Sequence, residues 1–240
     1  MSVKRVIEGV HLIPMGMANA YLIEGDGGLT LIDAGYPHKE AVVFGAIRGI
    51  GRSPDQLEHL IFTHGHPDHI GSAAAIVRET GARTYMHPLD IRIAEGGGPF
   101  RPLRAAPGLL QHVLCNLLYH PDERVQPVAI NQPLTVGEIL PIAGGFEVIH
   151  TPGHCAGHVA LLWRPGRMLF TGDVCMNIMG LGDPVGFESL QEGRASQRKL
   201  ASLSFDSAGF GHGEPILRDA STRFYNKWAR KNQVDRREAA

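Results

Sequence analysis

The chain has 240 residues, enough for one large domain with a sizeable hydrophobic core. Its 23 lysines and arginines nearly balance its 24 aspartates and glutamates, so the net charge of −1 gives no reason to expect nucleic acid or an anionic membrane as a partner. The three cysteines show no regular short spacing and the first residues lack the apolar core of a signal peptide, so we expect no disulfide framework and a cytoplasmic location.

The first third of the chain alternates predicted strands and helices. Apolar runs predict strands over residues 5–14, 20–25, 29–35 and 82–88. Apolar residues at helical spacing, closed by glycine, predict helices over residues 38–51 and 71–81. The segment 53–64 starts with helix-capping residues and ends in an apolar run that predicts a further strand.

The middle of the chain has a different composition. Residues 96–107 combine glycine, proline and arginine, so neither a helix nor a strand can run continuously through them. Residues 108–118 are apolar enough for a helix, although the apolar residues do not fall cleanly on one side. We therefore interpret residues 96–121 as an insertion within a single domain that spans residues 1–240, and as a candidate lid or pocket wall.

The last third returns to strands. They are predicted over residues 146–154, 158–166 and 167–174, and a helix over 189–203 precedes a short strand within 206–213. A final helix is predicted over 221–231, with Phe224 and Trp228 on one face and its basic residues, among them Lys227, facing solvent. Two strand-rich segments, each followed by helices, predict a sandwich of two sheets with helices outside.

Three histidines and an aspartate lie close together in the segment THGHPDHIGS, residues 63–72, directly after an apolar run. Because side chains two apart on an extended chain point the same way, His64 and His66 can face one metal ion. Pro67 should turn the chain, so that Asp68 and His69 face a neighbouring point. The loop therefore offers ligands to two metal centres, and its imidazole and carboxylate groups suit zinc as well as manganese, iron or cobalt.

Four ligands from one loop cannot complete two metal sites, so further ligands must come from other parts of the chain. His154, Asp173 and His212 each follow an apolar run that predicts a strand. Glycine flanks each of them, which lets the backbone turn sharply and approach a neighbour closely. We expect all three residues to lie at strand ends.

The motif H-x-H-x-D-H at residues 64–69, followed in order by TPGH, TGD and GHG, resembles the motif set of the metallo-β-lactamase superfamily. The resemblance runs from Leu31 to His212. It implies an α+β fold, a four-layer αβ/βα sandwich of two mixed β-sheets flanked by helices, with metals at one edge of the sheets. It also implies two zinc ions per chain, with manganese or iron as alternatives, whose ligands are His64, His66 and His154 at the first site, Asp68, His69 and His212 at the second, and Asp173 as the bridge.

The resemblance suggests roles for two further residues. Asp33 resembles an acid of this family that orients ligating imidazoles by accepting their second ring N–H, although a strand-end acid can instead cap a turn. His158, four residues after His154, is expected to border the site. Cys155 and Cys175 are close to the expected ligands, but nitrogen and oxygen donors already complete both metal sites, so we expect these thiols to pack in the interior.

Two cations held by only two carboxylates leave positive charge at the site even after a hydroxide binds, and they lower the pKa of bound water to about 7. The residues therefore predict a metal-dependent hydrolase that cleaves an ester, lactone or thioester of a small molecule by metal-bound hydroxide. Asp68 is expected to deliver a proton to the leaving group. A small-molecule substrate and a possible second copy of the chain in a homodimer are the expected partners.

Other members of the superfamily provide the alternatives. β-Lactamases of this fold lack a carboxylate at the position of Asp173, so antibiotic hydrolysis is disfavoured. Acyl-homoserine lactonases, which quench quorum sensing, share this aspartate but usually place a tyrosine soon after it, and residues 174–183 contain none. Persulfide dioxygenases keep the same motif with a single iron and are the alternative from another enzyme class. A binding protein without activity is disfavoured by the complete ligand set.

Overall fold

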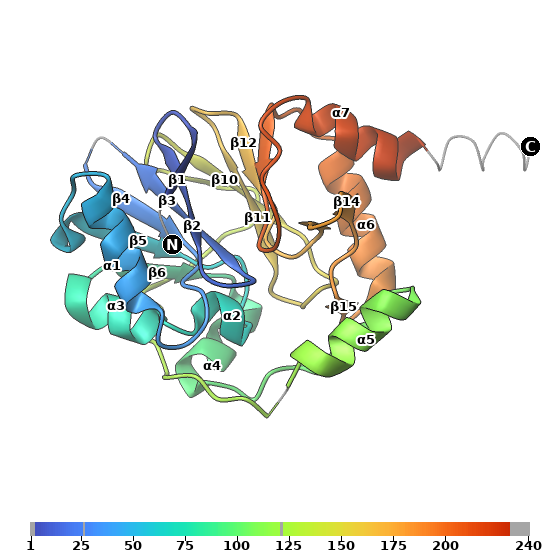
Figure 1. Ribbon diagram of the computed structural model, residues 1–240, viewed down its shortest axis with the longest axis horizontal. Coiled ribbons are helices and arrows are strands. Elements are labelled where there is room, and N and C mark those ends of the chain that lie inside the picture. Colours follow the sequence, from blue (N-terminus) through green and yellow to red (C-terminus); the bar gives the residue numbers. More distant parts are fainter. Residues whose placement is uncertain (1–2, 26, 121, 231–240) are drawn as a thin grey trace, which may run out of the picture.

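The computed structural model describes residues 3–25, 27–120 and 122–230 of the chain. Two β-sheets lie face to face, and helices cover their outer sides (Figure 1). This is the predicted arrangement of helix, sheet, sheet and helix. Among the helices that the structure describes, none combines the length and the apolar character needed to cross a membrane.

The first sheet has seven strands in the order β1-β2-β3-β4-β5-β6-β8. Neighbours are antiparallel from β1 to β4 and parallel from β4 to β8, so the sheet is mixed, as predicted. Its strands are β1 (Lys4–Ile7), β2 (Val10–Pro14), β3 (Asn19–Glu24), β4 (Leu29–Ile32), β5 (Leu57–Ile61), β6 (Arg83–Met86) and β8 (Gln132–Pro133).

The second sheet has five strands in the order β16-β12-β11-β10-β9. The pair of β12 and β16 is parallel and the other pairs are antiparallel, so this sheet is mixed too. Its strands are β9 (Ile139–Leu140), β10 (Phe146–His150), β11 (Val159–Trp163), β12 (Met168–Phe170) and β16 (Ser207–Gly209). Two small ribbons pair β13 (Met176–Asn177) with β14 (Leu181–Gly182), and β7 (Arg104–Ala105) with β15 (Gly186–Phe187).

The helices divide between the two outer faces. Along the chain they are α1 (Glu40–Gly49), a 3₁₀ turn η1 (Pro54–Gln56), α2 (Pro67–Ile70), α3 (Ala73–Thr80), α4 (Pro88–Gly96), α5 (Leu109–Leu118), α6 (Leu190–Ala201), α7 (Ala220–Phe224) and a π-helical turn η2 (Tyr225–Ala229). Helices α1 and α3 lie outside the first sheet, and α6 and α7 lie outside the second (Figure 1).

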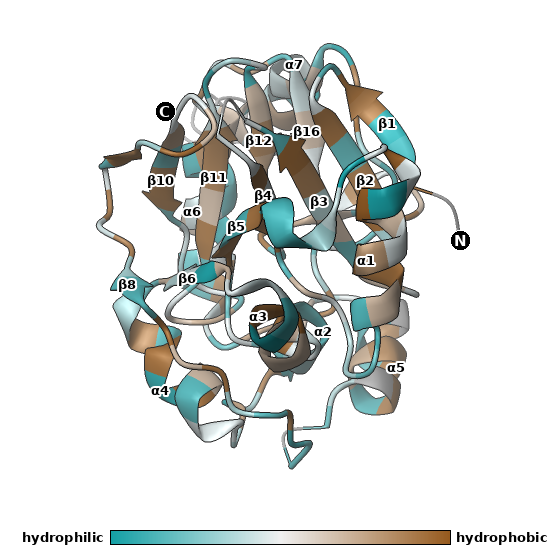
Figure 2. Cartoon of the chain, turned by 90° about the vertical axis from the view of Figure 1, so that its left-hand side faces the viewer, coloured by the Kyte–Doolittle hydropathy of each residue, from teal (hydrophilic) through white to brown (hydrophobic). Residues whose placement is uncertain are grey.

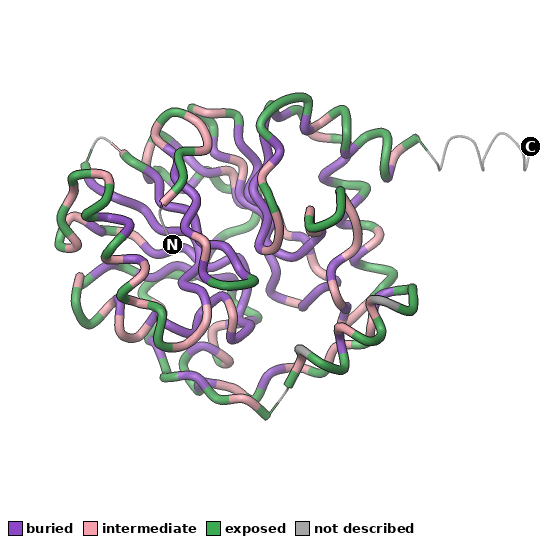
Figure 3. Tube along the Cα trace, in the orientation of Figure 1, coloured by how far each residue is buried: buried purple, intermediate pink, exposed green. Residues whose placement is uncertain are grey.

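Strand periodicity assigns neighbouring residues to different layers of the core. In β4, Leu31 packs toward α1 and α3, whereas Ile32 packs between the sheets. In β12, Leu169 packs toward α6 and α7, whereas Phe170 packs between the sheets. Side chains alternate across a strand, so an unbroken apolar run fills two layers at once. Figure 2 shows that hydrophobic residues follow the strands, and in Figure 3 the buried residues gather in the centre of the molecule, where Figure 1 shows the two sheets.

The structure corrects two details of the predicted elements. The predicted strand 5–14 is a hairpin, because Gly9 adopts a positive φ of 70° and turns the chain between β1 and β2. Helix α4 was not predicted, and Gly96 ends this helix rather than starting the insertion. Within the insertion, β7 pairs with β15, and α5 is the helix predicted over residues 108–118.

The predicted C-terminal helix is present as α7 and η2. Phe224 and Trp228 lie on one face, as predicted, with ring centroids 5.2 Å apart and both side chains in the core outside the second sheet. Lys227 is exposed. The last residue of the predicted helix, residue 231, lies outside the described part of the chain.

Candidate metal centre

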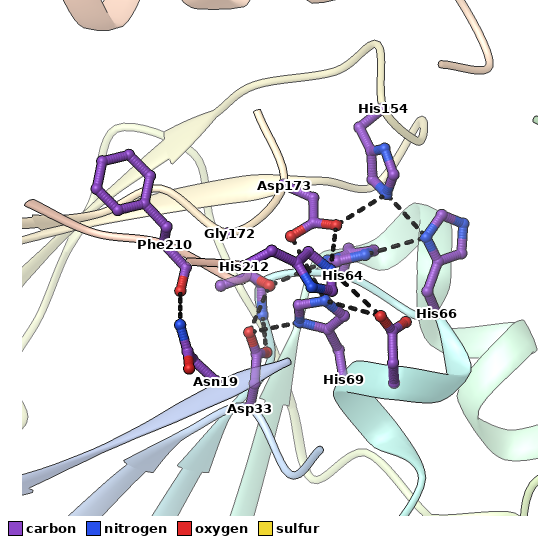
Figure 4. Close-up of polar contacts among 12 residues, drawn as sticks. Asn19, Asp33, His64, His66, His69, His154, Gly172, Asp173, Phe210 and His212 are labelled. Atoms are coloured by element: carbon purple, nitrogen blue, oxygen red, sulfur yellow. Dashed lines mark hydrogen bonds and ion pairs between the residues drawn. The ribbon is translucent and has the colours of Figure 1, made fainter. Parts of the chain in front are cut away.

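The directions of the strands bring the expected ligands to one place. In the first sheet, β4 and β5 are parallel, so the segments that follow them, which carry Asp33 and His64, leave the same edge. In the second sheet, β10, β12 and β16 run in one direction. The segments that follow these strands carry His154, Asp173 and His212. The two edges meet, and the expected ligands converge between them (Figure 4).

The loop after β5 changes direction at Pro67, as predicted. Pro67 is the first residue of α2, a position that tolerates the missing backbone N–H and starts a helix readily. His64 and His66 precede the turn, whereas Asp68 and His69 belong to it. The turn therefore separates the four side chains into two pairs.

Three imidazoles form what we call the imidazole half of the centre: His64, His66 and His154. Nδ1 of His66 lies 3.0 Å from Nε2 of His64 and 2.9 Å from Nε2 of His154. All three residues are buried. Zinc binds imidazole nitrogens at about 2.0–2.1 Å, and tetrahedral ligands at that distance lie about 3.3 Å from one another. The spacing of these nitrogens fits a single cation.

Two imidazoles and a carboxylate form the carboxylate half: Asp68, His69 and His212. Oδ2 of Asp68 lies 3.3 Å from Nε2 of His212 and 3.8 Å from Nε2 of His69. His69 is fully buried, whereas the side chains of Asp68 and His212 are 20% and 15% exposed. This half is therefore the one that solvent reaches.

Asp173 lies between the two halves. Its Oδ2 is 3.0 Å from Nε2 of His212 and 3.6 Å from Nε2 of His154, and its Oδ1 is 3.5 Å from Nε2 of His69. A carboxylate in this place can bind a cation on either side. Gly211 makes the approach possible, because a Cβ there would lie 2.0 Å from Oδ1 of Asp173.

Hydrogen bonds behind the imidazoles determine which ring nitrogen carries the proton. Nδ1 of His154 donates to the carbonyl of Gly186 at 2.8 Å, and Nδ1 of His212 donates to the carbonyl of Met17 at 2.9 Å. A neutral ring that donates from Nδ1 keeps an unprotonated Nε2. In the neutral form of each ring, the lone pair of Nε2 therefore points into the centre, as metal ligation requires.

Asp33 supports both halves. Its Oδ2 accepts from Nδ1 of His69 at 2.9 Å and from the hydroxyl of Thr63 at 2.8 Å. Because that hydroxyl proton is already donated, Thr63 accepts from Nδ1 of His64 at 3.0 Å. These contacts place Asp33 behind rings of both halves, and we propose that it orients them as metal ligands.

His158 borders the centre without facing it. Its Nε2 accepts the backbone N–H of Asp173 at 2.8 Å, and its Nδ1 donates to the hydroxyl of Thr151 at 2.8 Å. Both ring nitrogens are thus used, and the imidazole holds the bridging residue in place. Gly172 leaves room for the ring, since a Cβ there would lie 2.5 Å from Nε2 of His158. Asn19 holds the loop that carries His212, because its side chain donates to the carbonyl of Phe210 at 3.1 Å (Figure 4).

The two halves differ in charge. Burial, followed by the neighbouring imidazoles, lowers the pKa of His64 well below its usual value, and burial and His154 lower the pKa of His66 to about 3. Burial alone would also lower the pKa of His69, but the carboxylates of Asp68, Asp173 and Asp33 outweigh it and raise this pKa to about 9. The pKa of His212 is raised for the same reason, by Asp173 and Asp68 against the effect of burial.

The donor atoms fit divalent cations. Nε2 of His69 and Oδ1 of Asp173 are buried and have no hydrogen-bond partner among the described residues. Two such atoms facing each other are costly unless something binds both. A set of imidazole nitrogens and carboxylate oxygens suits zinc, and also manganese or iron.

Sequence reasoning missed a carboxylate that holds both ligand loops of the imidazole half. Asp90, fully buried at the start of α4, accepts from the backbone N–H of Gly65 at 2.9 Å and from the thiol of Cys155 at 3.3 Å. Gly65 separates His64 from His66, and Cys155 follows His154. A Cβ at Gly157 would lie 2.2 Å from Oδ1 of Asp90, so this loop packs directly on the carboxylate.

The insertion is attached to this carboxylate. Arg101 forms ion pairs with Asp90 and, at 2.6 Å, with Glu188. The hydroxyl of Tyr119 donates to the carbonyl of Arg101, and its ring centroid lies 5.7 Å from that of His66. The insertion therefore contacts the imidazole half, and its role as a lid or pocket wall stays a prediction. A helix-starting Pro88 followed by an acid was the available signal for Asp90, but the same pattern also marks an ordinary exposed cap.

The cysteines near the centre are buried and free. Burial, followed by the carboxylates of Asp90 and Glu188, raises the pKa of the Cys155 thiol well above its usual value. The thiol therefore keeps its proton and donates it to Asp90. Cys175 packs in the core outside the second sheet. Both cysteines pack in the interior, as expected.

Comparison with known proteins adds a family to this geometry. The profile of the Metallo-beta-lactamase superfamily matches residues 13–207. A probable metallo-hydrolase of Bacillus subtilis, YflN, is 28% identical over 227 residues, which cover 87% of this chain and 85% of that protein. A thioesterase of Emericella nidulans, pkgB, is 27% identical over 201 residues, which cover 83% of this chain and 46% of that protein.

Solved structures share the fold. The subclass B3 metallo-beta-lactamase BJP-1 of Bradyrhizobium japonicum superposes with a TM-score of 0.73 and 19% identity, covering 100% of this chain and 94% of that chain. At this identity the likeness shows the fold alone. The chain spans less than two thirds of the length of several curated relatives, including pkgB.

Proposed function

The chain belongs to the metallo-beta-lactamase superfamily, and on this basis we propose that it is a dinuclear zinc hydrolase that cleaves an ester-type bond of a small molecule. The superfamily match and the metallo-hydrolase relative support a metal-dependent hydrolase. The proposal adds the number and identity of the metals, the seven ligands and the class of bond.

The observation that carries the proposal is the convergence of seven side chains from both sheets on one small region. The ligands would be His64, His66 and His154 for one cation and Asp68, His69 and His212 for the other, with Asp173 shared between them. When bound, the cations would supply a Lewis acid for a carbonyl oxygen and an acidified water. A surface loop with a chance excess of histidine would not bury these rings or orient their protons.

Asp68 is the residue we propose as the proton carrier. Its carboxylate is the most exposed side chain of the set, so solvent reaches it. Burial would raise its pKa, but His69 and His212 outweigh this and hold the pKa well below its usual range. The carboxylate is therefore ionised at neutral pH in the metal-free protein, and we propose that in the reaction it accepts a proton from the attacking water and passes it to the leaving group.

Among ester-type bonds, a thioester has the most support. The relative from Emericella nidulans is named a thioesterase, and this chain covers 83% of its own length in that match. The lactone alternative lacks the tyrosine expected after Asp173, because β13 and β14 place methionine, asparagine, leucine and glycine there. The thiol that leaves from a thioester is a better leaving group than an alkoxide, so it makes a smaller demand on the proton carrier.

Elemental analysis of the purified protein, combined with a panel of thioesters, lactones and phosphodiesters, tests the proposal. We expect about two zinc ions per chain, turnover of a thioester or lactone, loss of turnover with a chelator, and recovery when zinc is returned. Asp68→Asn serves as the matched variant, because it keeps the shape of the side chain. One iron per chain, together with sulfite formation from a persulfide, would instead establish the dioxygenase alternative.

A further inference from the structure

A cavity of about 430 Å³ lies outside the metal centre, and three basic side chains line it. This volume falls within the usual range for small-molecule sites. The lining comes from α5, β14, α6 and η2, which lie on the same side of the molecule in Figure 1. The lining residues are Gln111, Gly182, Asp183, Arg194, Arg198, Lys227 and Trp228.

The charges in this cavity are only partly neutralised. Arg194 is paired with Asp183 through both of its terminal nitrogens, one of them at 2.7 Å. Arg198 and Lys227 form no ion pair with any described residue. Arg194 and Arg198 are four residues apart on α6 and therefore share a face, and Lys227 reaches the cavity from η2. After the ion pair is subtracted, two positive charges remain, in a chain whose net charge is −1.

Two unpaired cations around one hollow match the charge of a phosphate group, which carries about −1.5 to −2 at neutral pH. A guanidinium presents a fork of N–H donors to phosphate oxygens, and a lysine adds a mobile point charge. Trp228 provides an apolar boundary and is itself largely buried. The lining therefore favours an anion attached to a larger molecule over a neutral ligand.

One segment of the chain joins this cavity to the metal centre. It starts at Asp173, passes through β13 and β14 to the cavity residue Asp183, and continues to Gly186, whose carbonyl accepts from His154. Gln197 ties the segment together, because its side-chain N–H donates to the carbonyl of Val174 at 3.1 Å and to Asp183 at 3.1 Å. The same stretch of backbone thus borders both sites and fixes one relative to the other.

We propose that this cavity binds the phosphate-bearing end of the substrate whose ester-type bond is cleaved at the metal centre. The inference rests on the proposed function and names the substrate class, a thioester of a phosphorylated carrier thiol. The carrier's phosphate would contact Arg198 and Lys227, and its thiol end would follow the Asp173–Gly186 segment to the metals. Hydrolysis adds water across the C–S bond and gives the carboxylic acid and the carrier thiol.

The experiment compares two thioesters with the same acyl group: acyl-coenzyme A, which carries phosphates, and the neutral acyl-N-acetylcysteamine. The double variant Arg198→Glu, Lys227→Glu should raise the KM of acyl-coenzyme A about tenfold or more relative to the KM of the neutral thioester, because charge-assisted hydrogen bonds are lost. Both residues are exposed, so the substitutions remove no core contact. The control variant Arg78→Glu, Arg83→Glu changes the charge equally on the opposite flank and should leave the ratio of the two KM values unchanged.

A binding measurement keeps this inference separate from the proposed function. Adenosine 3′,5′-bisphosphate, which has no thioester, should bind the zinc-loaded protein in calorimetry and bind the double variant about tenfold or more weakly. If neither thioester is hydrolysed but this binding behaves as expected, the proposed function fails and the phosphate site stands. Equal binding by wild type and double variant would overturn the site. Full displacement by an equal concentration of inorganic phosphate would overturn the assignment to substrate and indicate a site for free phosphate.

Discussion

The two halves of the metal centre are built from different groups and hold protons differently. The imidazole half consists of three rings, and burial keeps the pKa values of His64 and His66 low. In the carboxylate half, Asp68 and Asp173 keep the pKa values of His69 and His212 high. A cation therefore enters the first half without displacing protons, whereas the second half must release them. We infer that, as the pH falls, the carboxylate half loses affinity for its metal at a higher pH than the imidazole half does.

The largest effect is expected for Asp68→Asn, which should remove turnover but leave the metal of the imidazole half in place. Asp68→Asn should lower turnover roughly ten-thousandfold, because the variant loses both a proton carrier and a ligand of the carboxylate half. About one zinc per chain should remain, held by the imidazole half. Steady-state kinetics and elemental analysis on the same sample check both points. Turnover close to that of the wild type would remove Asp68 from the mechanism.

His154→Ala breaks the other half. His154 supplies Nε2 to the imidazole half and contacts Asp173 at 3.6 Å, so its loss removes one of three ring ligands. We expect turnover to fall roughly a thousandfold, because the cation supplies several kcal/mol of charge stabilisation. Metal content should fall further than in His212→Ala, which leaves the imidazole half complete. Equal metal loss in the two variants would contradict the ranking of the halves.

Asp33→Ala tests the group that serves both halves. The carboxylate accepts from His69 directly and reaches His64 through Thr63. Metal affinity should weaken by about 10–100-fold, the usual cost of losing such a partner, and both cations should be affected. Competition with a chromophoric chelator measures this. Weakening confined to one cation would show that the contact through Thr63 has no effect.

Asp90→Asn tests a carboxylate that contacts only the imidazole half. It should weaken the affinity for the cation of the imidazole half by about tenfold. The amide has no charge to pair with Arg101, and its single oxygen cannot accept from Arg101 and from Gly65 and Cys155 as the two carboxylate oxygens do. The carboxylate half should keep its affinity. Asp206→Asn removes an exposed ion pair with Arg167 and is the control. If the control and Asp90→Asn behave alike, Asp90 has no positioning role.

The smallest expected effect is a pH dependence of the thermal stability of the metal-free protein. The pKa of His69 is about 9 in the fold, above its value of about 6.5 in an unfolded chain. A raised pKa means that His69 stabilises the fold fully below about pH 6.5, and this contribution is lost as the pH rises through about 9. The Tm measured with a chelator present should therefore fall over that range more steeply in wild type than in His69→Gln. Parallel curves would contradict the pKa shift.

The sequence predicted which side chains gather in one place, because four of them share a short loop and the other three follow predicted strands. His64, His66, Asp68 and His69 occupy one loop, and the glycines before Asp173 and His212 mark close approach, which the contacts of Gly172 and Gly211 explain. Two sheets with outer helices followed from the apolar runs, since residues such as Leu31 and Ile32 fill different layers of the core.

What the sequence did not predict depends on contacts between distant segments. Asp90 became part of the site only because α4 packs beneath the two ligand loops, and no periodic pattern reports that contact. In the sequence, Arg198 and Lys227 cannot be distinguished from ordinary solvent-exposed helix residues. In the fold, α6 and η2 bring them to one cavity. The hairpin at Gly9 was missed because its turn is shorter than the apolar run that surrounds it.

The central claim is that seven side chains from two sheets hold two divalent cations, and counting metal in the active protein tests it most directly. Zinc should be titrated into metal-depleted protein while bound metal and hydrolytic turnover are followed together. We predict that turnover rises with the second equivalent and stops rising at about two zinc ions per chain. Full activity at one equivalent, or activity that does not depend on zinc, would contradict the account.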